Sequence, residues 1–420
     1  MDILLLNPGT ELLTKRSYNR EPPSGLLTMA TYLRMKGLEV KVIDTNDKAL
    51  FNSYLMSKPP LIGITCLTNT YNVALKTINY IKTKSPDSKI VMGGPHASFM
   101  WKEILSSQSN IDFIILGEGE YSLFQLYHLL NNNYRKTKGL AYRNGKKVLS
   151  NGFSKIFDVD SFPFPDRKNI IPTHYDVASI IVNRGCPFNC SFCVRQKLFT
   201  NVRVRNPLNI VKEMADLENL GYQFINLYDN INIYSDIPLE ICKLINKYNV
   251  HIPWGAELRG DKLSYQMTRE MAKAGCKVIA IGIESADTNL LKLNGKFQSL
   301  NKIKSGISNA KKAGIAVQCY FIIGLPGDSQ KSFEKTIKFI EKLPLIPGED
   351  RIDFFIATPY PGSRLFDEGN DVFNIKIIDK NWDHYDTEHV IFETDKLSYN
   401  EIKSLYGFAK KYSDTFNKDN

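Results

Sequence analysis

The run Arg184-Gly185-Cys186-Pro187-Phe188-Asn189-Cys190-Ser191-Phe192-Cys193 decides how this sequence is interpreted. It sets three cysteines in the spacing C-x3-C-x2-C, directly after an apolar, strand-like stretch at 178–182. Thiolates so close in sequence can converge on one metal centre, and iron–sulfur clusters are held by such groups. Three ligands would leave one iron of a four-iron cluster open to bind another molecule. A zinc site is the alternative, but structural zinc needs a fourth ligand, for which His174 is the nearest histidine.

Length and composition are those of an ordinary soluble protein. The chain has 420 residues, 43% hydrophobic and 23% charged, which allows two or three domains. No apolar run reaches the roughly 18 residues of a membrane span. The apolar run at the N-terminus is too short for a signal peptide and has no basic residues before it, so we expect a cytoplasmic location. The remaining cysteines stand singly in apolar stretches and are expected in the core, without a disulfide framework: Cys66, Cys242, Cys276 and Cys319.

The formal net charge of +10 indicates either a lysine-rich solvated surface or an anionic partner, such as RNA or a phosphorylated substrate. No basic run carries the interleaved aromatic residues of RNA-binding segments. Nucleic acid is therefore not expected as a partner.

The first 140 residues predict an α/β domain with a doubly wound, Rossmann-like sheet. Short β-branched runs alternate with helical patterns. The runs are Ile3–Leu6, Val40–Ile43, Leu61–Cys66, Ile90–Met92 and Phe113–Leu116, and the helical patterns are 26–35, 71–82, 100–105 and 121–130. Ligands of such sheets bind at the carboxyl ends of the strands. The candidate binding residues in the loops there are Asn7, Thr65, Gly93, Gly94, Pro95, His96, Gly117, Glu118, Gly119 and Glu120.

The remainder predicts a linker, a barrel and a cap. Residues 141–172 are expected to connect the domains, with a hairpin across Asn144-Gly145. Residues 173–358 predict six βα units, a partial (β/α)6 barrel of the TIM type with its site at the carboxyl ends of the strands. Its strands are expected at 178–183, 223–228, 252–258, 277–283, 316–323 and 352–357, and its helices near 208–220, 237–247, 264–274, 300–313 and 329–342. Residues 359–420 are expected to form a small cap that ends in a helix.

With an aromatic residue, Phe192, before its last cysteine, the motif resembles that of the radical S-adenosylmethionine superfamily. The resemblance implies a [4Fe-4S] cluster on Cys186, Cys190 and Cys193, with S-adenosylmethionine as a second cofactor. Phe192 and Gly324 are then expected beside the adenine.

Other positions of the resemblance imply further contacts with S-adenosylmethionine. Asp229 would hold the amino group, although Tyr228-Asp229-Asn230 departs from the commoner Gly-Gly-Glu. Glu284, with Ser285 beside it, would contact the ribose, since a carboxylate can accept two hydrogen bonds from a diol. Arg259 would bind the carboxylate. An ordinary role also stays open for each of them. Asp229 would be a turn residue, Glu284 an exposed side chain before a helix N-cap at Ser285, and Arg259 a member of an ion pair.

The N-terminal half resembles the cobalamin-binding domain found in many of these enzymes. Gly93-Gly94-Pro95-His96-Ala97 and Leu116-Gly117-Glu118-Gly119-Glu120 match its loops. The motif Asp-x-His-x-x-Gly, whose histidine ligates cobalt, is absent, because Phe99 follows three residues after His96. The lower cobalt face would then be open, and the alternative is a domain that has lost its cofactor.

The resemblance implies a cobalamin-dependent radical enzyme, a methyltransferase acting at an unactivated carbon, with its two domains facing one substrate cavity. It would need an electron donor such as flavodoxin or ferredoxin and would act on a small molecule or peptide. Radical cyclisation, rearrangement and epimerisation are alternatives. So are methylthiolation and a non-enzymatic cobalamin-binding role, but methylthiolation needs three N-terminal cysteines, and Cys66 alone precedes Cys186.

Overall fold

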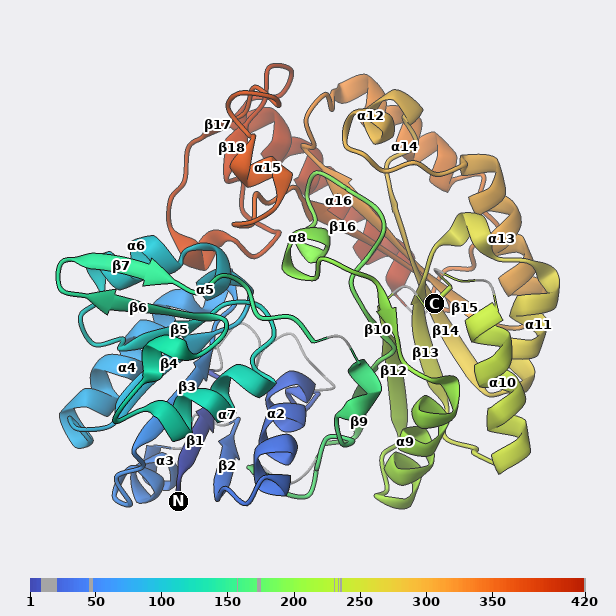
Figure 1. Ribbon diagram of the computed structural model, residues 1–420. Coiled ribbons are helices and arrows are strands. Elements are labelled where there is room, and N and C mark those ends of the chain that lie inside the picture. Colours follow the sequence, from blue (N-terminus) through green and yellow to red (C-terminus); the bar gives the residue numbers. More distant parts are fainter. Residues whose placement is uncertain are drawn as a thin grey trace. The chain divides into compact units, whose positions relative to one another are not determined.

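The computed structural model describes residues 1–8, 21–44, 48–156, 158–171, 175–229, 231–232, 234 and 236–418 (Figure 1). Gly9, His174 and Asn230 lie outside these ranges. The chain divides into two compact units, Met1–Asp176 and Val177–Asn420. None of the helices in the described ranges has the length and apolar character needed to cross a membrane.

The first unit is built on one sheet with the strand order β7-β6-β5-β4-β3-β1-β2-β8. Its parallel centre is almost entirely buried, as expected for strands covered on both faces. The central strands are β1 (Ile3–Leu6), β2 (Val40–Ile43), β3 (Leu61–Thr65), β4 (Lys89–Gly93) and β5 (Phe113–Ile115). The helices are α2 (Ser24–Met35), α3 (Lys48–Leu55), α4 (Tyr71–Lys84), α5 (Pro95–Phe99), α6 (Trp101–Ser107) and α7 (Glu120–Leu129). The predicted doubly wound domain is confirmed, and the chain reverses its direction of winding between β1 and β3, where such folds bind ligands.

The predicted linker, 141–172, contributes strands to this unit in its described residues and does not merely connect it to the next. The hairpin β6 (Leu140–Asn144) and β7 (Lys147–Ser150) extends the sheet antiparallel beyond β5. Its turn contains Gly145 with φ of 61°. At the other edge, β8 (Ile170–Ile171) pairs in parallel with β2. The sequence did not reveal β8, because a two-residue strand has no periodicity.

The second unit is a six-stranded, all-parallel sheet in the order β16-β15-β14-β13-β12-β9. Its strands are β9 (Val177–Ile181), β12 (Phe224–Tyr228), β13 (Trp254–Leu258), β14 (Cys276–Glu284), β15 (Ala316–Ile323) and β16 (Arg351–Ile356). In the described residues β9 and β16 do not pair with each other, so the barrel is open. The predicted partial barrel is therefore confirmed.

Helices cover the outside of this sheet. They are α9 (Pro207–Asn219), α10 (Asp236–Tyr248), α11 (Tyr265–Lys273), α13 (Leu300–Lys312), α14 (Gln330–Ile340) and α16 (Tyr399–Asn417), with the short α8 (Arg195–Leu198), α12 (Thr288–Leu293) and α15 (Arg364–Asp367) in loops. The C-terminal α16 packs on β16 (Figure 1). It is thus the outer helix of the sixth βα unit, and the cap is the segment inserted between β16 and α16.

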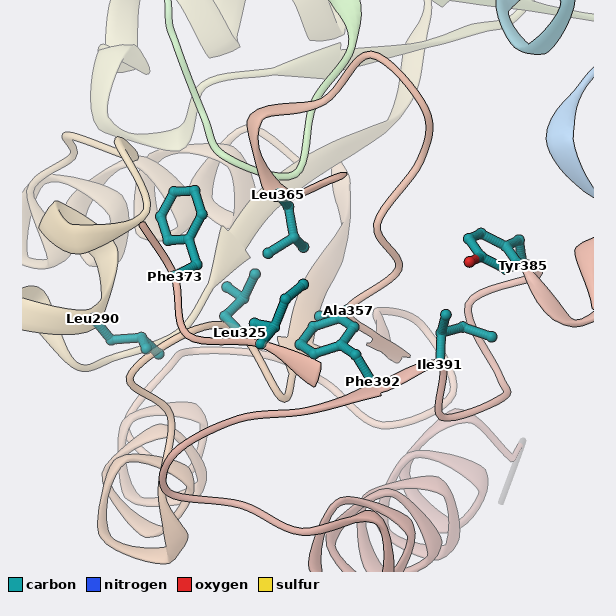
Figure 2. Packing of buried hydrophobic residues seen from close by; sticks show 9 residues of the cluster. Leu290, Leu325, Ala357, Leu365, Phe373, Tyr385, Ile391 and Phe392 are labelled. Carbon is teal, nitrogen blue, oxygen red and sulfur yellow. The ribbon is translucent and has the colours of Figure 1, made fainter. Parts of the chain in front are cut away.

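The cap segment has its own apolar core, which Figure 2 shows from close by. It also contains one short antiparallel pair of strands, β17 (Lys376–Ile377) and β18 (Phe392–Glu393). The buried cluster joins the cap to loops of the barrel and consists of Leu290, Leu325, Ala357, Leu365, Phe373, Ile375, Tyr385, Ile391 and Phe392. Phe192, from the cysteine motif, packs against this cluster. The cap therefore helps to fix the cysteine loop.

Candidate active site

The cysteine loop lies between two short strands that pair antiparallel, β10 (Asn183–Arg184) and β11 (Arg203–Val204). Two glycines with left-handed backbones hold it. Gly185 has φ of +94°, and a Cβ there would lie 2.4 Å from Asn201 O. Gly295 has φ of +68°, and a Cβ there would lie 2.4 Å from Asn189 O. Only glycine fits such positions, so the path of the loop depends on both.

Asn294 connects the cysteine loop to two neighbouring loops. Ser191 N donates to Asn294 O at 2.8 Å, and Ser191 Oγ donates to Asn294 Oδ1 at 2.6 Å. Asn294 Nδ2 donates to Leu290 O and Pro326 O, each at 3.0 Å. Sequence reasoning missed this residue, although Asn-Gly just after a helical segment is a known helix-ending signal.

The three thiols of Cys186, Cys190 and Cys193 are partly buried and near enough to influence one another electrostatically. Burial raises the pKa of Cys190 to about 12, although the charge of Lys296 opposes this shift. Burial also raises the pKa of Cys193, which Arg195 opposes. Within the described ranges, no three His, Cys, Asp or Glu side chains are gathered closely enough to hold a metal ion.

This donor set fits an iron–sulfur cluster in its chemistry. A cluster is held by thiolates, and binding to a metal must displace their protons. Three cysteines on one short loop supply those ligands, and two cationic side chains beside them, Lys296 and Arg195, would balance the negative charge. The assignment of Cys186, Cys190 and Cys193 as ligands stays a prediction.

Glu284 ends β14 with an unusual backbone, φ of 64°, at an irregularity in the pairing with β15. Its Oε1 accepts a hydrogen bond from Lys296 Nζ at 2.8 Å. Gly282 leaves room for this pair, since a Cβ there would lie 2.5 Å from Glu284 Oε1. Glu284 keeps a second oxygen for another donor. Sequence reasoning missed Lys296, for which one lysine among many gave no signal.

Asp229 follows β12 and also has a left-handed backbone, φ of 76°. Residues other than glycine adopt this conformation at a cost and do so preferentially at functional sites. Its Oδ1 accepts a hydrogen bond from Arg195 Nη1. Its predicted role, holding an amino group, is compatible with this position.

Arg259 differs from its predicted role. Its Nε and Nη2 donate to the two oxygens of Asp261 at 3.0 and 2.9 Å, and its guanidinium lies 4.1 Å from the centre of the Phe188 ring. Nη2 also donates to Phe297 O. The edge formed by Nε and Nη2 is therefore already filled, which is the ion-pair alternative left open for Arg259.

Ser285 and Gly324 occupy structural positions. Ser285 Oγ accepts from Asp287 N at 3.1 Å, while Asp287, not Ser285, caps α12. Gly324 has φ of +81°, and its N donates to Asp328 Oδ2 at 2.9 Å. Asp328 thereby closes the turn, and burial raises the pKa of its carboxyl.

A cavity of about 290 Å³ lies beside Phe192 and Glu284. The residues that line it come from the cysteine loop, the ends of β14, β15 and β16, and the cap, and they include Phe192, Glu284, Tyr320, Ile322, Ala357 and Thr387. A second cavity of about 220 Å³ lies among inner residues of the barrel, including Tyr228, Glu257, Gln318 and Tyr320. The predicted residues Phe192 and Glu284 thus share one mainly apolar cavity. The other predicted contacts are not among its lining residues: Asp229, Arg259, Ser285 and Gly324.

In the first unit, three predicted residues, Thr65, Gly93 and Gly94, line a cavity of about 60 Å³ at the carboxyl ends of β3 and β4. Gly94 has φ of +95°, and a Cβ would lie 2.6 Å from Cys66 O. At Gly93 nothing lies within 4 Å of the place that a Cβ would take. The backbone here can therefore be approached closely by a ligand.

The remaining residues predicted in this unit support its loops. Asn7 Nδ2 donates to Asp44 Oδ1 at 2.8 Å, and buried Glu118 accepts from Ile156 N at 2.8 Å. His96 is 1% exposed, and its ring centre lies 4.6 Å from that of Tyr71. Pro95 begins α5, Glu120 is buried at the start of α7, and Gly117 and Gly119 are closely packed.

Comparison with known proteins agrees with this geometry. The chain matches the family model of the Radical SAM superfamily over residues 180–340 and that of the B12 binding domain over residues 11–126. It is 29% identical, over 96% of its length and 90% of the relative's, to a Pyrococcus horikoshii protein named uncharacterized methyltransferase PH0819. It is 26% identical, over 96% of its length and 75% of the relative's, to the anaerobic magnesium-protoporphyrin IX monomethyl ester cyclase of Rubrivivax gelatinosus.

Two solved structures share the fold. The radical S-adenosylmethionine methyltransferase TsrM from Kitasatospora setae, with cobalamin and a [4Fe-4S] cluster bound, matches with a TM-score of 0.76 at 15% identity, over 97% of this chain and 91% of that one. The cobalamin-dependent S-adenosylmethionine radical enzyme OxsB, with aqua-cobalamin and S-adenosylmethionine bound, matches with a TM-score of 0.71 at 18% identity. That match covers 98% of this chain and 61% of OxsB.

Proposed function

The chain belongs to the radical S-adenosylmethionine superfamily and carries a B12-binding domain, and we propose that it methylates an unactivated carbon of its substrate. Its cofactors are a [4Fe-4S] cluster, S-adenosylmethionine and cobalamin. When bound, they supply an electron, a deoxyadenosyl radical that removes a hydrogen atom, and a methyl group, chemistry that belongs to the cofactors and not to side chains. The observation that carries the proposal is the presence of both matched domains in one chain.

The side chains would bind and orient the cofactors and shield them from water. Cys186, Cys190 and Cys193 would hold the cluster. The cavity beside Phe192 and Glu284 would enclose the adenosyl group, because an aromatic face can stack on a base and a carboxylate can accept from a ribose diol. Its apolar walls would keep water from a reactive radical.

In the first unit, the cobalamin would approach the exposed backbone of Thr65, Gly93 and Gly94. The buried His96, packed on Tyr71, would support the loop and not ligate cobalt. Asn7, Glu118 and Glu120 would act in the same way, by fixing loop ends.

The enzyme requires a reductant, and we propose a small electron-transfer protein such as flavodoxin or ferredoxin. The substrate would be a small molecule or peptide. The similarity to a cyclase along nearly the whole chain supports a second candidate, cobalamin-dependent radical ring closure.

The test uses protein purified without oxygen, from cells supplied with cobalamin. Its visible spectrum should contain both cluster and corrin absorbance. With dithionite and S-adenosylmethionine we expect 5′-deoxyadenosine from wild type and none from the variant in which all three motif cysteines are alanine. Undiminished deoxyadenosine from that variant would refute the radical assignment. S-adenosylhomocysteine as an additional product supports methyl transfer, and its absence in the presence of turnover favours the cyclase alternative.

A further inference from the structure

Arg195, two residues after the last motif cysteine, has two buried hydrogen-bond donors without a partner. Its Nη1 donates to Asp229, whereas its Nε and Nη2 have no acceptor among the described residues and do not reach solvent. The side chain as a whole is 24% exposed. Buried donors are nearly always satisfied in folded proteins, so an unsatisfied pair requires an explanation.

The two free donors form one edge of the guanidinium. Nε–H and an Nη2–H point in the same direction, and this fork matches the two oxygens of a carboxylate. The same chain fills that edge elsewhere in this way. Arg259 donates from Nε and Nη2 to Asp261, and Arg364 donates from the same two atoms to Glu368. At Arg195 no carboxylate of the described residues makes a hydrogen bond to this fork.

The surroundings of Arg195 indicate which carboxylate would bind to this fork. Its charge interacts with the thiols of Cys193 and Cys186, so the side chain lies at the cysteine loop. It also interacts with the Glu257 carboxylate, which makes no hydrogen bond to the fork. Asp229, on its other edge, ends β12 with a left-handed backbone. A cation with a free fork and an anion beside it are complementary to a zwitterion, which is the form of an α-amino acid head group.

We propose, as a step that rests on the proposed function, that Arg195 binds the carboxylate of S-adenosylmethionine through Nε and Nη2 while Asp229 receives its ammonium group. The resemblance suggested Arg259 for the carboxylate, but the Nε–Nη2 edge of Arg259 is occupied by Asp261. Arg195 and Asp229 then fix the amino acid end of the cofactor next to the cluster, while the cavity at Phe192 receives the adenosyl end.

Equilibrium binding to the anaerobically reconstituted protein tests this assignment without turnover. The probes are S-adenosylmethionine and decarboxylated S-adenosylmethionine, which keeps the amine and the sulfonium. Wild type should bind the intact cofactor about 10- to 100-fold more tightly, the range expected for a charged hydrogen-bonded pair. Arg195→Gln should bind both probes equally weakly. Arg195→Lys keeps the charge beside Asp229 but loses the fork, and should retain only part of the preference.

Arg259→Lys is the matched control and should keep the full wild-type preference. Iron content and the visible spectrum show whether each variant still assembles the cluster. If Arg195→Gln fails to assemble it, the comparison of the two probes is made with Arg195→Lys. The inference is overturned if the Arg195 variants keep the wild-type preference, if Arg259→Lys loses it, or if wild type shows none. Because only binding is measured, a failure to form S-adenosylhomocysteine would count against the proposed methyl transfer and leave this result unaffected.

Discussion

Lys296 Nζ lies 2.8 Å from Glu284 Oε1, with the two side chains only 13% and 8% exposed. The ammonium also acts on the Cys190 thiol. Burial disfavours the charged form of Lys296, but Glu284 and Cys190 together raise the pKa of Lys296. A raised lysine pKa gives stability that is present below its ordinary value of 10.5 and is lost as pH rises through the folded value. Lys296 is therefore charged throughout the neutral range.

Lys296→Met should strongly destabilise the second unit, because it leaves the Glu284 carboxylate buried without a partner. Removing one member of a buried ion pair typically costs about 3–5 kcal/mol. The double variant Glu284→Gln/Lys296→Met buries no charge and should recover part of this loss. Urea unfolding of the apo-protein measures both. A double variant as unstable as Lys296→Met would show that the loss arises from packing and not from the stranded charge.

Gly295→Ala should reduce the iron retained after reconstitution, since its Cβ would displace the backbone of Asn189 in the cysteine loop. Gly314→Ala is the matched control, with φ of +77° and no atom within 4 Å of the added Cβ. That control should lose only about 1 kcal/mol of stability from backbone strain and keep its iron. Equal iron content in the two variants would mean that Gly295 does not shape the loop.

The sequence predicted the strands and helices well because their signals are local. Buried parallel strands are short apolar runs, and the outer helices carry apolar residues at helical spacing. The glycine turns and the cysteine loop were likewise marked by their own residues. The strand β8 carried no such signal. The assignment of α16 to the barrel depends on its packing against β16, which its own sequence does not reveal.

Site residues that belong to a sequence motif were predicted. Site residues whose role depends on a contact with a residue distant in the sequence were missed. Arg195 became a candidate only because two of its donors are buried and have no acceptor in the part of the chain that the structure describes. For Arg259 the sequence left a cofactor contact and an ion pair open, and the structure shows an ion pair with Asp261. Lys296 and Asn294 act through residues on other loops, and pairwise contacts of this kind are set by the tertiary fold.

His96 should make the first unit less stable in mild acid. Burial lowers the pKa of its imidazole from 6.5 to about 4, so the folded state excludes a proton that the unfolded state binds. Stability is complete above 6.5 and is lost as pH falls toward 4. From about pH 7.5 to about pH 5.5 the loss should be about 1 kcal/mol. His96→Leu should remove that part of the pH dependence in denaturant unfolding, whereas replacing the exposed His128 by asparagine should not. An unchanged slope in His96→Leu would assign the acid sensitivity to other groups.

Thr387→Gly should stabilise the protein and weaken its binding of S-adenosylmethionine. Thr387 lines the cavity beside Phe192 and has φ of 71°, a costly conformation for a β-branched residue. Its carbonyl accepts from Ile356 N at 2.7 Å, a contact that glycine keeps. Relief of strain should add about 1 kcal/mol to the free energy of unfolding, while loss of the side chain enlarges the cavity and lowers affinity.

Lys58→Gly is the control for Thr387→Gly, since exposed Lys58 has φ of 47° and lies in the other unit. It should gain stability with no change in cofactor affinity. Thermal unfolding and equilibrium binding measure the two quantities separately. If Thr387→Gly instead destabilises the protein, the hydroxyl's hydrogen bond to Asp386 O outweighs the strain. If affinity is unchanged, the cavity wall at Thr387 does not touch the cofactor. A stability gain together with weaker binding would show that the strained backbone is retained for the cavity it completes.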